Sequence, residues 1–437
     1  MQNNILIVGS GAREHIIAKA IKKSSEVDNV FCVGSNMNPG IKELCTKLFL
    51  GDINDPDFVL QKALDHSITM AIVGPENPLL FGVSDILSEA NIKVIGPKKN
   101  LAQIETSKTF TRNLFKEYDI PGSPKYQSFQ SMKGVKNYLS QIGNNYVVKY
   151  DGLAGGKGVK VSGDHLKSYK EAIEFCKSIV KQGGRFLIEE KFIGEEFSLM
   201  SFCDGATIKH MPAVQDHKRA YEDDKGPNTG GMGTYSDINH SLPFLTRSDM
   251  EEAKSINTAT ADALMDKFGE GYVGILYGGF MCTENGVKLI EYNARFGDPE
   301  VMNILSILKT DFFNICQAIT NKTLDKIDIE FENKATVCKY AVPEGYPDDP
   351  IKGERIFISK ENMDDGLYFA SVDLRDGGFI ESGSRTVVSV GVGNTITEAE
   401  MISEKKINDV KGPLFHRKDI GTDRLIRKRI EFMDSLR

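Results

Sequence analysis

Short apolar runs alternate with helical patterns through the first hundred residues. Consecutive apolar residues of the kind found in strands buried on both faces occur at 5–8, 30–33, 70–73 and 94–95. Between the first two runs, residues from about Glu14 to Lys22 have the spacing of a helix. Strands that alternate with helices build parallel sheets. We therefore expect residues 1–104 to form a doubly wound parallel α/β domain.

The pattern changes after residue 104. An apolar stripe at helical spacing predicts a helix from about Ser107 to Tyr118, and residues 123–200 are a mixed α/β segment. The Asn-Gly pair within Leu276 to Asn293 predicts two antiparallel strands joined by a tight turn. From about Phe331, short strands precede a terminal helical region. The expected fold is an α/β and α+β multidomain protein with domains at 1–104, 105–330 and 331–437.

Residues 216–236, DHKRAYEDDKGPNTGGMGTYS, have almost no apolar periodicity. A structureless segment of this length inside a compact protein is usually functional or disordered. Its composition favours a functional loop.

The overall charge and the cysteines exclude several classes of protein. The formal net charge is -7, which argues against a general nucleic-acid binder. The 7 cysteines form no C-x-x-C pair and are typical of reduced thiols. The N-terminus has no signal-peptide pattern, and no apolar run approaches 18 residues. We expect a cytoplasmic protein that binds neither nucleic acid nor membrane.

The stretch KYDGLAGGKGVKV, residues 149–161, has the composition of a phosphate-binding loop. A P-loop would need glycine at Asp151 and Ser or Thr at Gly158, and it would lead into a helix. Here the loop joins two strand-like runs, so it reads as a β-hairpin whose backbone N–H groups could cover a phosphate chain. The alternative is a glycine turn with a solvated lysine.

The strand VKLIEYN, residues 287–293, predicts a magnesium site. Side chains alternate along a strand, so Glu291 and Asn293 share one face and Lys288 and Ile290 lie on the other. Carboxylate and amide oxygens are hard ligands that suit Mg²⁺ shared with substrate phosphates. Arg295 follows, where it could meet an anion bound by that metal. The alternative is an exposed polar strand face.

Two further patterns are less specific. GSGAREH, residues 9–15, resembles G-x-G-x-x-G, but Glu14 replaces the third glycine, so a phosphate at the helix N-terminus is a better expectation than a dinucleotide. Acidic residues at 189, 190, 195 and 196 surround the end of a strand. They could hold ribose hydroxyls, or they could belong to an exposed turn.

Together these motifs resemble the ATP-grasp ligases. More narrowly, GSGAREH, GPENP (74–78), KYDGLAGGKGV, DHKRA…GPNTGGMG and EYNARFGDPE resemble the phosphoribosylamine–glycine ligase family, from residue 5 to near the C-terminus. The resemblance implies an ATP-grasp core with a mobile lid at about 122–196 and a small β-rich C-terminal domain. It also implies a monomer or weak dimer.

The resemblance assigns roles residue by residue. Lys108, Lys149 and Lys157, with the hairpin glycines Gly155, Gly156 and Gly158, would contact the phosphates of ATP. Glu189 or Glu190, the backbone near Phe192 and Ile193, and Glu196 would hold adenosine. Glu291 and Asn293 would hold Mg²⁺, with Mn²⁺ as an alternative, and Arg295 and Lys157 would be catalytic. Substrate-binding residues would be Gly11, Arg13, Glu76, Asp216, Lys218, Asn228, Thr229, Gly230, Gly231, Met232, Gly233 and Asp298.

The implied reaction joins glycine to 5-phosphoribosylamine through a glycyl phosphate, with ATP as cosubstrate, in purine biosynthesis. A carboxylate is a poor electrophile and must be activated, so positioning and charge stabilisation suffice without a covalent nucleophile. The chain departs from the family at Tyr150, where small residues are usual, and at Asn77, where Asp is usual. Another ATP-grasp enzyme that activates formate or bicarbonate, and a nucleotide-binding protein without catalysis, remain the alternatives.

Overall fold

The computed structural model describes residues 2–155, 158–359 and 366–437. The N-terminal region is a five-stranded parallel sheet in the order β3-β2-β1-β4-β5, as expected for a doubly wound domain. Its elements are β1 (Asn4–Val8), α1 (Ala12–Lys22), β2 (Asn29–Gly34), α2 (Pro39–Leu44), β3 (Lys47–Leu50), α3 (Pro56–Asp65), β4 (Met70–Val73), α4 (Glu76–Phe81), α5 (Val83–Glu89) and β5 (Lys93–Ile95). The four apolar runs are β1, β2, β4 and β5, and all four are largely buried.

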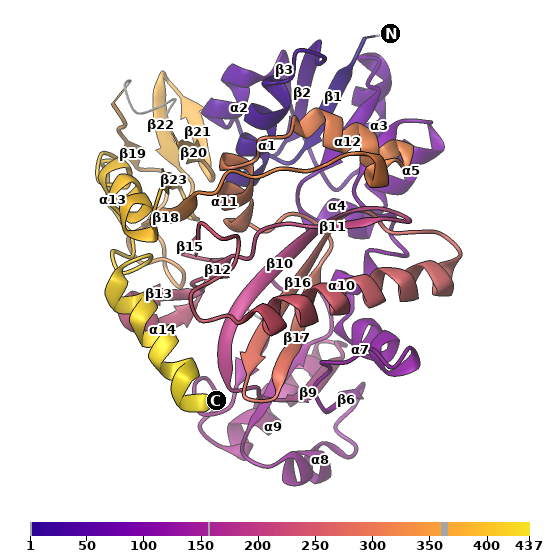
Figure 1. Ribbon diagram of the computed structural model, residues 1–437, viewed down its shortest axis with the longest axis vertical. Coiled ribbons are helices and arrows are strands. Elements are labelled where there is room, and N and C mark those ends of the chain that lie inside the picture. Colours follow the sequence, from indigo (N-terminus) through magenta and orange to yellow (C-terminus); the bar gives the residue numbers. More distant parts are fainter. Residues whose placement is uncertain (1, 156–157, 360–365) are drawn as a thin grey trace.

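Two helices lead from this sheet into a separate layer at the bottom of Figure 1. They are α6 (Gln103–Thr106) and α7 (Lys108–Glu117). The layer contains β6 (Tyr126–Phe129), α8 (Val135–Ile142), β7 (Tyr146–Tyr150), β8 (Val159–Val161), α9 (Tyr169–Lys181) and β9 (Phe186–Glu190). Its antiparallel sheet runs β6-β9-β7-β8 and packs with its helices around a hydrophobic core of its own. We call this layer the lid.

The central sheet lies between the lid and the N-terminal domain (Figure 1). Its antiparallel order is β11 (Ile208–His210), β10 (Gly194–Asp204), β16 (Val273–Thr283) and β17 (Gly286–Asn293). Strands β16 and β17 form the hairpin expected from Asn-Gly, in which Thr283 pairs with Gly286. Helix α10 (Arg247–Phe268) packs across this sheet, and α11 (Glu300–Ser306) and α12 (Phe312–Asn321) follow it.

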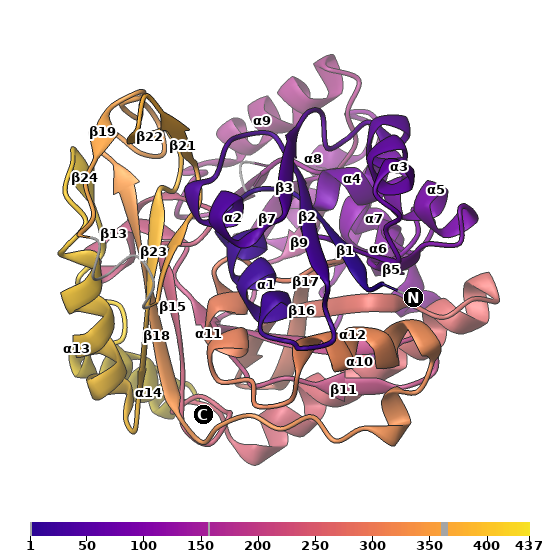
Figure 2. The same ribbon diagram turned by 90° about the horizontal axis from the view of Figure 1, so that it is seen from above.

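The C-terminal part contains two further sheets beside the N-terminal domain (Figure 2). The larger one runs β12 (Gln215–Asp216), β15 (Gly233–Ser236), β18 (Ala335–Pro343), β23 (Val387–Gly393) and β20 (Leu367–Phe369), and β24 (Leu414–Phe415) also pairs with β18. The smaller one runs β19 (Arg355–Ile356), β22 (Gly378–Glu381) and β21 (Val372–Arg375). Helices α13 (Ile396–Ile407) and α14 (Asp423–Leu436) complete the chain.

The expectation of a continuous loop over 216–236 is wrong. This segment contains the ribbon β13 (Arg219–Tyr221) and β14 (Lys225–Asn228), with a short turn of helix between them, and it ends in β15. Strand β15 pairs with β18, so the segment joins the C-terminal sheet. Buried hydroxyls replace apolar side chains in β15: Thr234 bonds to Asn303, and Ser236 bonds to Thr336. A strand stabilised by polar pairs has no apolar alternation to detect.

Among the helices of the described residues, none combines the length and the apolar character that crossing a bilayer requires.

Candidate active site

A cavity of about 1340 Å³ opens where the lid, the central sheet and the C-terminal part meet. Most of the residues expected to bind ATP, metal or substrates line it. They are Lys108, Lys149, Gly155, Gly158, Glu189, Glu190, Phe192, Ile193, Glu196, Glu291, Asn293, Arg295, Arg13, Glu76, Asp216, Lys218, Asn228, Thr229, Gly230 and Asp298. Residues more than 280 positions apart in sequence are thus gathered around one space.

Four expected substrate residues lie outside the cavity lining. Gly231, Met232 and Gly233 lead into β15, and Met232 is fully buried. The N–H of Gly11 donates to the Glu14 carboxylate at 2.6 Å, so Glu14 occupies a donor that a phosphate would have used. Gly156 and Lys157 lie outside the described residues.

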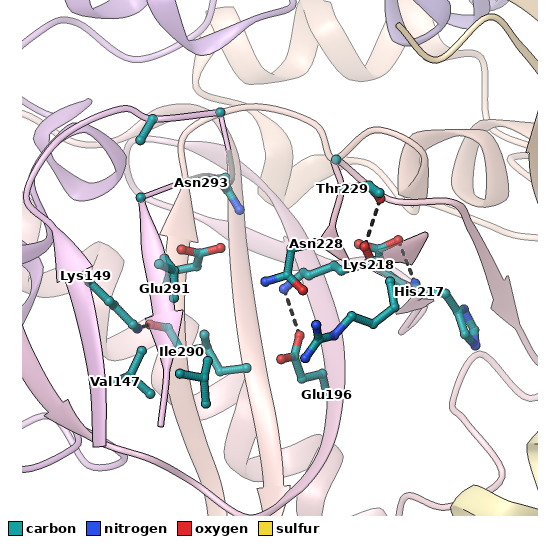
Figure 3. Close-up of a pocket in the computed structure, with 18 of the residues that line it drawn as sticks. Val147, Lys149, Glu196, His217, Lys218, Asn228, Thr229, Ile290, Glu291 and Asn293 are labelled. Carbon is teal, nitrogen blue, oxygen red and sulfur yellow. Dashed lines mark hydrogen bonds and ion pairs between the residues drawn. The ribbon is translucent and has the colours of Figure 1, made fainter. Parts of the chain in front are cut away.

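Glu291 and Asn293 both point into the cavity from β17 (Figure 3). The prediction that Ile290 faces away is wrong, because Ile290 lines the cavity too. Gly279 pairs with Glu291 and the next residue, Phe280, pairs with Leu289, which leaves Ile290 as the extra residue of a β-bulge. The bulge restarts the alternation and places Ile290 and Glu291 on the same side.

Several cations keep the Glu291 carboxylate ionised. Burial alone would raise its pKa, but Lys218, Lys108, Lys149 and Arg295 outweigh burial and lower the pKa. Figure 3 shows Glu291 between Lys149 on the lid side and Lys218 on the opposite side. Within the described part of the chain, no hydrogen-bond donor occupies this carboxylate. An ionised, unoccupied carboxylate among lysines is suited to a metal–phosphate complex.

Glu189 is enclosed by two cations. Arg112 of α7 donates to both of its carboxylate oxygens, at 2.7 and 3.1 Å, and the ammonium of Lys149 lies 2.8 Å away. Burial opposes its ionisation, yet Arg112 and Lys149 lower the pKa of Glu189 to about 2. Arg112 and Lys149 also donate to the carbonyl of Ile290, at 2.6 and 2.9 Å. Glu189 therefore fixes Lys149 against β17, and its carboxylate has its hydrogen-bonding capacity taken up by protein.

The glycine segment forms the predicted antiparallel hairpin. Val147 pairs with Val161 and Lys149 pairs with Val159 across β7 and β8. The Tyr150 ring lies over glycines: a Cβ at Gly152 or Gly184 would stand 2.7 or 2.8 Å from it. The departure from small residues at this position is thus accommodated by glycines beneath the ring. Among the described residues, no atom lies within 4 Å of a Cβ built at Gly155, so this position of the hairpin faces open space.

Arg295 is held among oxygens at the far end of the cavity. Its guanidinium lies 3.0 Å from Glu105 and 3.4 Å from Glu76, and it donates to the side-chain oxygen of Asn293 at 3.2 Å. Burial raises the pKa of Glu105 to about 7, against the opposing charge of Arg295. These contacts aim the arginine at the space beside Asn293.

The wall opposite the lid is built from the ends of β10 and the β13–β14 ribbon. The Lys218 ammonium pairs with Glu196 at 2.8 Å, and the backbone carbonyl of Lys218 accepts from the N–H of Thr229 at 2.7 Å. Burial and the nearby Glu300 carboxylate raise the pKa of Asp216 well above its usual range. The Asp216 carboxyl group, the Glu196 carboxylate and the Lys218 ammonium thus line the same wall of the cavity.

The C-terminal part contributes Arg385 to the same wall. Its guanidinium donates to the carbonyls of Gly230 and Asp298, at 2.6 and 2.7 Å, and lies 3.4 Å from the Asp298 carboxylate. Arg385 also stacks on Tyr340, with its central carbon 4.6 Å from the ring centre. Arg385 therefore holds the backbone at Gly230 in place beside the cavity.

Glu291 and Asn293 fit a divalent cation that has further ligands from elsewhere. Both present oxygen donors, which suits Mg²⁺. Among the described residues no group of three or more His, Cys, Asp or Glu side chains gathers as a metal centre. Two protein ligands leave most of an octahedral shell for water and phosphate oxygens.

Family models match nearly the whole chain. The N domain of phosphoribosylglycinamide synthetase matches residues 3–105, its ATP-grasp (A) domain residues 106–301, and its C domain residues 336–423. The chain belongs to the phosphoribosylglycinamide synthetase family. The phosphoribosylamine–glycine ligase of Methanocaldococcus jannaschii is 50% identical over 443 residues, with 99% of each chain covered. The same ligase of Methanosarcina barkeri is 46% identical, again with 99% of each chain covered.

Solved structures agree with this family assignment. The phosphoribosylamine–glycine ligase of Thermotoga maritima superposes with a TM-score of 0.81 at 28% identity, covering 95% of this chain and 99% of that one. The biotin carboxylase domain of Hydrogenobacter thermophilus 2-oxoglutarate carboxylase, solved with MgADP, has a TM-score of 0.71 at 14% identity, with 99% and 94% covered. At that identity the second likeness shows a shared fold alone.

Sequence reasoning missed five charged residues of this synthetase-family site. Arg112 lies on a helix whose pattern indicated only a core stripe, and no local signal marks it. Glu105 precedes Lys108 by three residues, but only the fold brings it to Arg295. Glu300 lies in the first turn of α11, where an acidic residue is common, so its sequence position does not point to the cavity. The remaining two, Arg385 and Arg429, come from the C-terminal part.

Replacing Glu189 with Gln should destabilise the protein at neutral pH by about 3–5 kcal/mol, because Arg112 and Lys149 would lose their buried counter-charge. The folded-state pKa of about 2 lies below the unfolded value, so the stabilisation is complete above about pH 4.5. It is lost as pH falls from about 4.5 to 2, and the gap between wild type and variant narrows there. Urea unfolding at pH 7 and pH 3 measures this difference.

The half-buried neighbour Glu190 is the matched control, and Glu190→Gln should change stability by less than about 1 kcal/mol. A Glu189→Gln variant as stable as wild type at pH 7, or a difference that persists unchanged at pH 3, contradicts the assignment.

Proposed function

We propose that the protein joins glycine to 5-phosphoribosylamine with ATP, releasing glycinamide ribonucleotide, ADP and phosphate, as a step of purine synthesis. The observation that carries the proposal is the position of Glu291. It stands ionised in one cavity between lysines of the lid and of the ribbon wall. Family membership supports the substrates, and the site geometry supports the chemistry.

The first chemical step transfers the terminal phosphoryl group of ATP to a carboxylate oxygen of glycine, which leaves ADP and an acyl phosphate. Lys149 and Lys108 stabilise the charge on the phosphates from the lid side. Lys108 already points at the hairpin, where it donates to the carbonyl of Gly152 at 3.2 Å. Arg295 stabilises the transferring group from the side of Asn293. Such fixed charges need no reorganisation when charge develops in the transition state.

In the second step, the amine of phosphoribosylamine attacks the acyl carbon. The bond from that carbon to the phosphate oxygen breaks, inorganic phosphate leaves, and the nitrogen loses a proton. Asp216, Lys218 and the Asn228–Gly230 loop line the pocket for glycine and phosphoribosylamine. Arg13 and Glu76, at the N-terminal end of the cavity, are the candidates to line the ribose-phosphate end of the pocket, with Arg13 as the cation for the phosphate.

Glu291 and Asn293 would hold Mg²⁺, with Mn²⁺ as an alternative. The bound ion would neutralise charge on the ATP phosphates. The glycine hairpin, including Gly155, Gly156, Lys157 and Gly158, would cover the triphosphate from above. Closure of the lid would exclude water, which otherwise hydrolyses the acyl phosphate.

The direct test measures ADP release with glycine and freshly made phosphoribosylamine, omitting each substrate in turn. We expect full-rate ADP release only when both are present, because the amine completes the cycle. ADP release with formate or bicarbonate in place of glycine, or none with any acid, would remove the proposed function.

Glu291→Ala should lower turnover by about a thousandfold or more while the protein stays folded, since the variant removes one of two metal ligands. Steady-state ADP release and thermal unfolding together measure this. Glu284→Ala, at the exposed turn of the same hairpin, is the control and should keep full activity. Near-normal turnover of Glu291→Ala at ordinary Mg²⁺ concentration would exclude the metal assignment.

Lys157→Ala should raise the KM for ATP or lower kcat by at least about tenfold, because one cation over the triphosphate is lost. Initial rates at varied ATP and varied glycine separate the two substrates. Lys170→Ala, an exposed lysine on α9 of the same lid, should leave both unchanged. An effect confined to the KM for glycine would mean that the hairpin does not cover phosphate.

A further inference from the structure

The tip of the β13–β14 ribbon is docked on the last part of the chain. The N–H of Asp223 donates to Asp419 at 2.9 Å. Arg417 donates to the carbonyl of Arg219 and to the carboxylate of Asp224, both at 3.1 Å. These contacts join a ribbon of the central part to residues nearly 200 positions later in sequence.

One residue of α14 joins this ribbon to β10. The Arg429 guanidinium lies 2.5 Å from Asp224 at the ribbon tip and 3.3 Å from Glu195 at the start of β10. All three side chains are largely shielded, with exposed fractions of 15% for Arg429, 25% for Asp224 and 8% for Glu195. The other oxygen of Glu195 accepts from the Gln215 amide at 3.2 Å. A shielded cation between two carboxylates of different elements fixes their separation.

The same two elements continue directly into the substrate wall. Glu196 follows Glu195 and pairs with Lys218, which lies at the base of the ribbon. Thr229, which follows the second strand of the ribbon, donates its backbone N–H to the carbonyl of Lys218. Arg429 therefore links the ribbon to β10 at the ribbon tip, and the Glu196–Lys218 pair links the same two elements at the ribbon base. Figure 1 shows α14, in yellow, lying along this edge of the molecule.

The charges require Arg429 in this position. Burial raises the pKa of Glu195 to about 7, and Arg429 is the main group that opposes the rise. Without the guanidinium, Glu195 and Asp224 would face each other as buried carboxylates, with Arg417 the only described cation still bonded to Asp224. Repulsion or protonation would then release the ribbon tip from β10.

We propose that Arg429 is a positioning residue for substrate binding: through Asp224 and Glu195 it holds the ribbon that carries Lys218, Asn228 and Thr229. The expected effect of Arg429 on substrate binding rests on the proposed function, whereas its expected effect on the structure of the ribbon does not. The family's C-domain model ends at residue 423, before Arg429. The helix that follows is thus assigned a part in forming the glycine and phosphoribosylamine pocket.

The first test compares Arg429→Gln with Arg427→Gln by amide hydrogen exchange, without substrates. Arg427 is exposed on the same helix, and its variant loses the same charge. We expect amides of residues 219–229 to exchange at least about tenfold faster in Arg429→Gln only, while residues 169–181 of the lid are unaffected. Equal exchange of the ribbon in the two variants overturns the proposal, whatever reaction the protein catalyses.

The second test is kinetic and uses the full chain. Arg429→Gln should raise the KM for glycine and phosphoribosylamine by at least about tenfold, with kcat and the KM for ATP within about threefold of wild type. Arg429→Lys, which keeps the charge, should recover part of the loss. Unchanged KM values for both acceptor substrates, or a fall in kcat alone, overturn the positioning role.

Asp224→Asn provides the second variant if Arg429→Gln does not fold. It keeps the Arg429–Glu195 pair and weakens the contacts of Asp224 with Arg429 and with Arg417. The same rise in both KM values, smaller in size, is expected, and its absence overturns the proposal. If the wild-type protein releases no ADP, the proposed function is rejected but the role of Arg429 is not. Hydrogen exchange without substrates would still decide that role.

Discussion

The buried ion pairs of Glu189 are the interaction on which the site depends. Glu189 belongs to the lid sheet, Arg112 to the helix that leads into the lid, and both Arg112 and Lys149 bond to the carbonyl of Ile290 on the central sheet. Two cations and one anion leave a net positive charge beside the cavity. Breaking such a buried set leaves an uncompensated charge and costs far more than a surface pair. The lid is therefore tied to β17 at the point where phosphate would enter.

This arrangement explains how an acidic protein can bind a triphosphate. The net charge of -7 is distributed over the whole chain, whereas Lys108, Lys149, Lys218 and Arg295 gather in the cavity and all act on the ionised Glu291. A wall of low dielectric strengthens these interactions relative to water. The bulge at Ile290 contributes in two ways. The Ile290 carbonyl accepts from Arg112 and Lys149, and the bulge turns Glu291 toward the cavity.

Features with a local physical signal could be predicted from the sequence. Apolar runs gave the parallel sheet, the Asn-Gly pair gave the β16–β17 hairpin, and two-residue alternation placed Glu291 beside Asn293. The bulge could not be predicted, because an extra residue in a strand leaves no mark in hydrophobicity, and Ile290 was therefore assigned to the wrong face. Strand β15 was missed since the hydroxyls of Thr234 and Ser236 are buried against polar side chains of other elements, where a typical strand would bury apolar groups.

The partners of functional residues were harder to foresee than the residues themselves. Arg112, Glu105, Arg385 and Arg429 act through residues far away in sequence, and nothing within a few positions of each reports that partner. Glu189 illustrates the difference: its place at the cavity was expected, but its enclosure by Arg112 and Lys149 makes it a support for Lys149. A charged side chain at a strand end can be recognised locally, whereas its counter-charge is set by tertiary structure.

The central claim is that the cavity passes a phosphoryl group from ATP to the carboxylate of glycine. Glycine labelled with ¹⁸O in its carboxylate tests this directly, since the oxygen that bonds to phosphorus stays with the phosphate when the amine displaces it. The account predicts one labelled oxygen in each inorganic phosphate released, read by mass spectrometry or ³¹P NMR. Phosphate free of label during full turnover would contradict it.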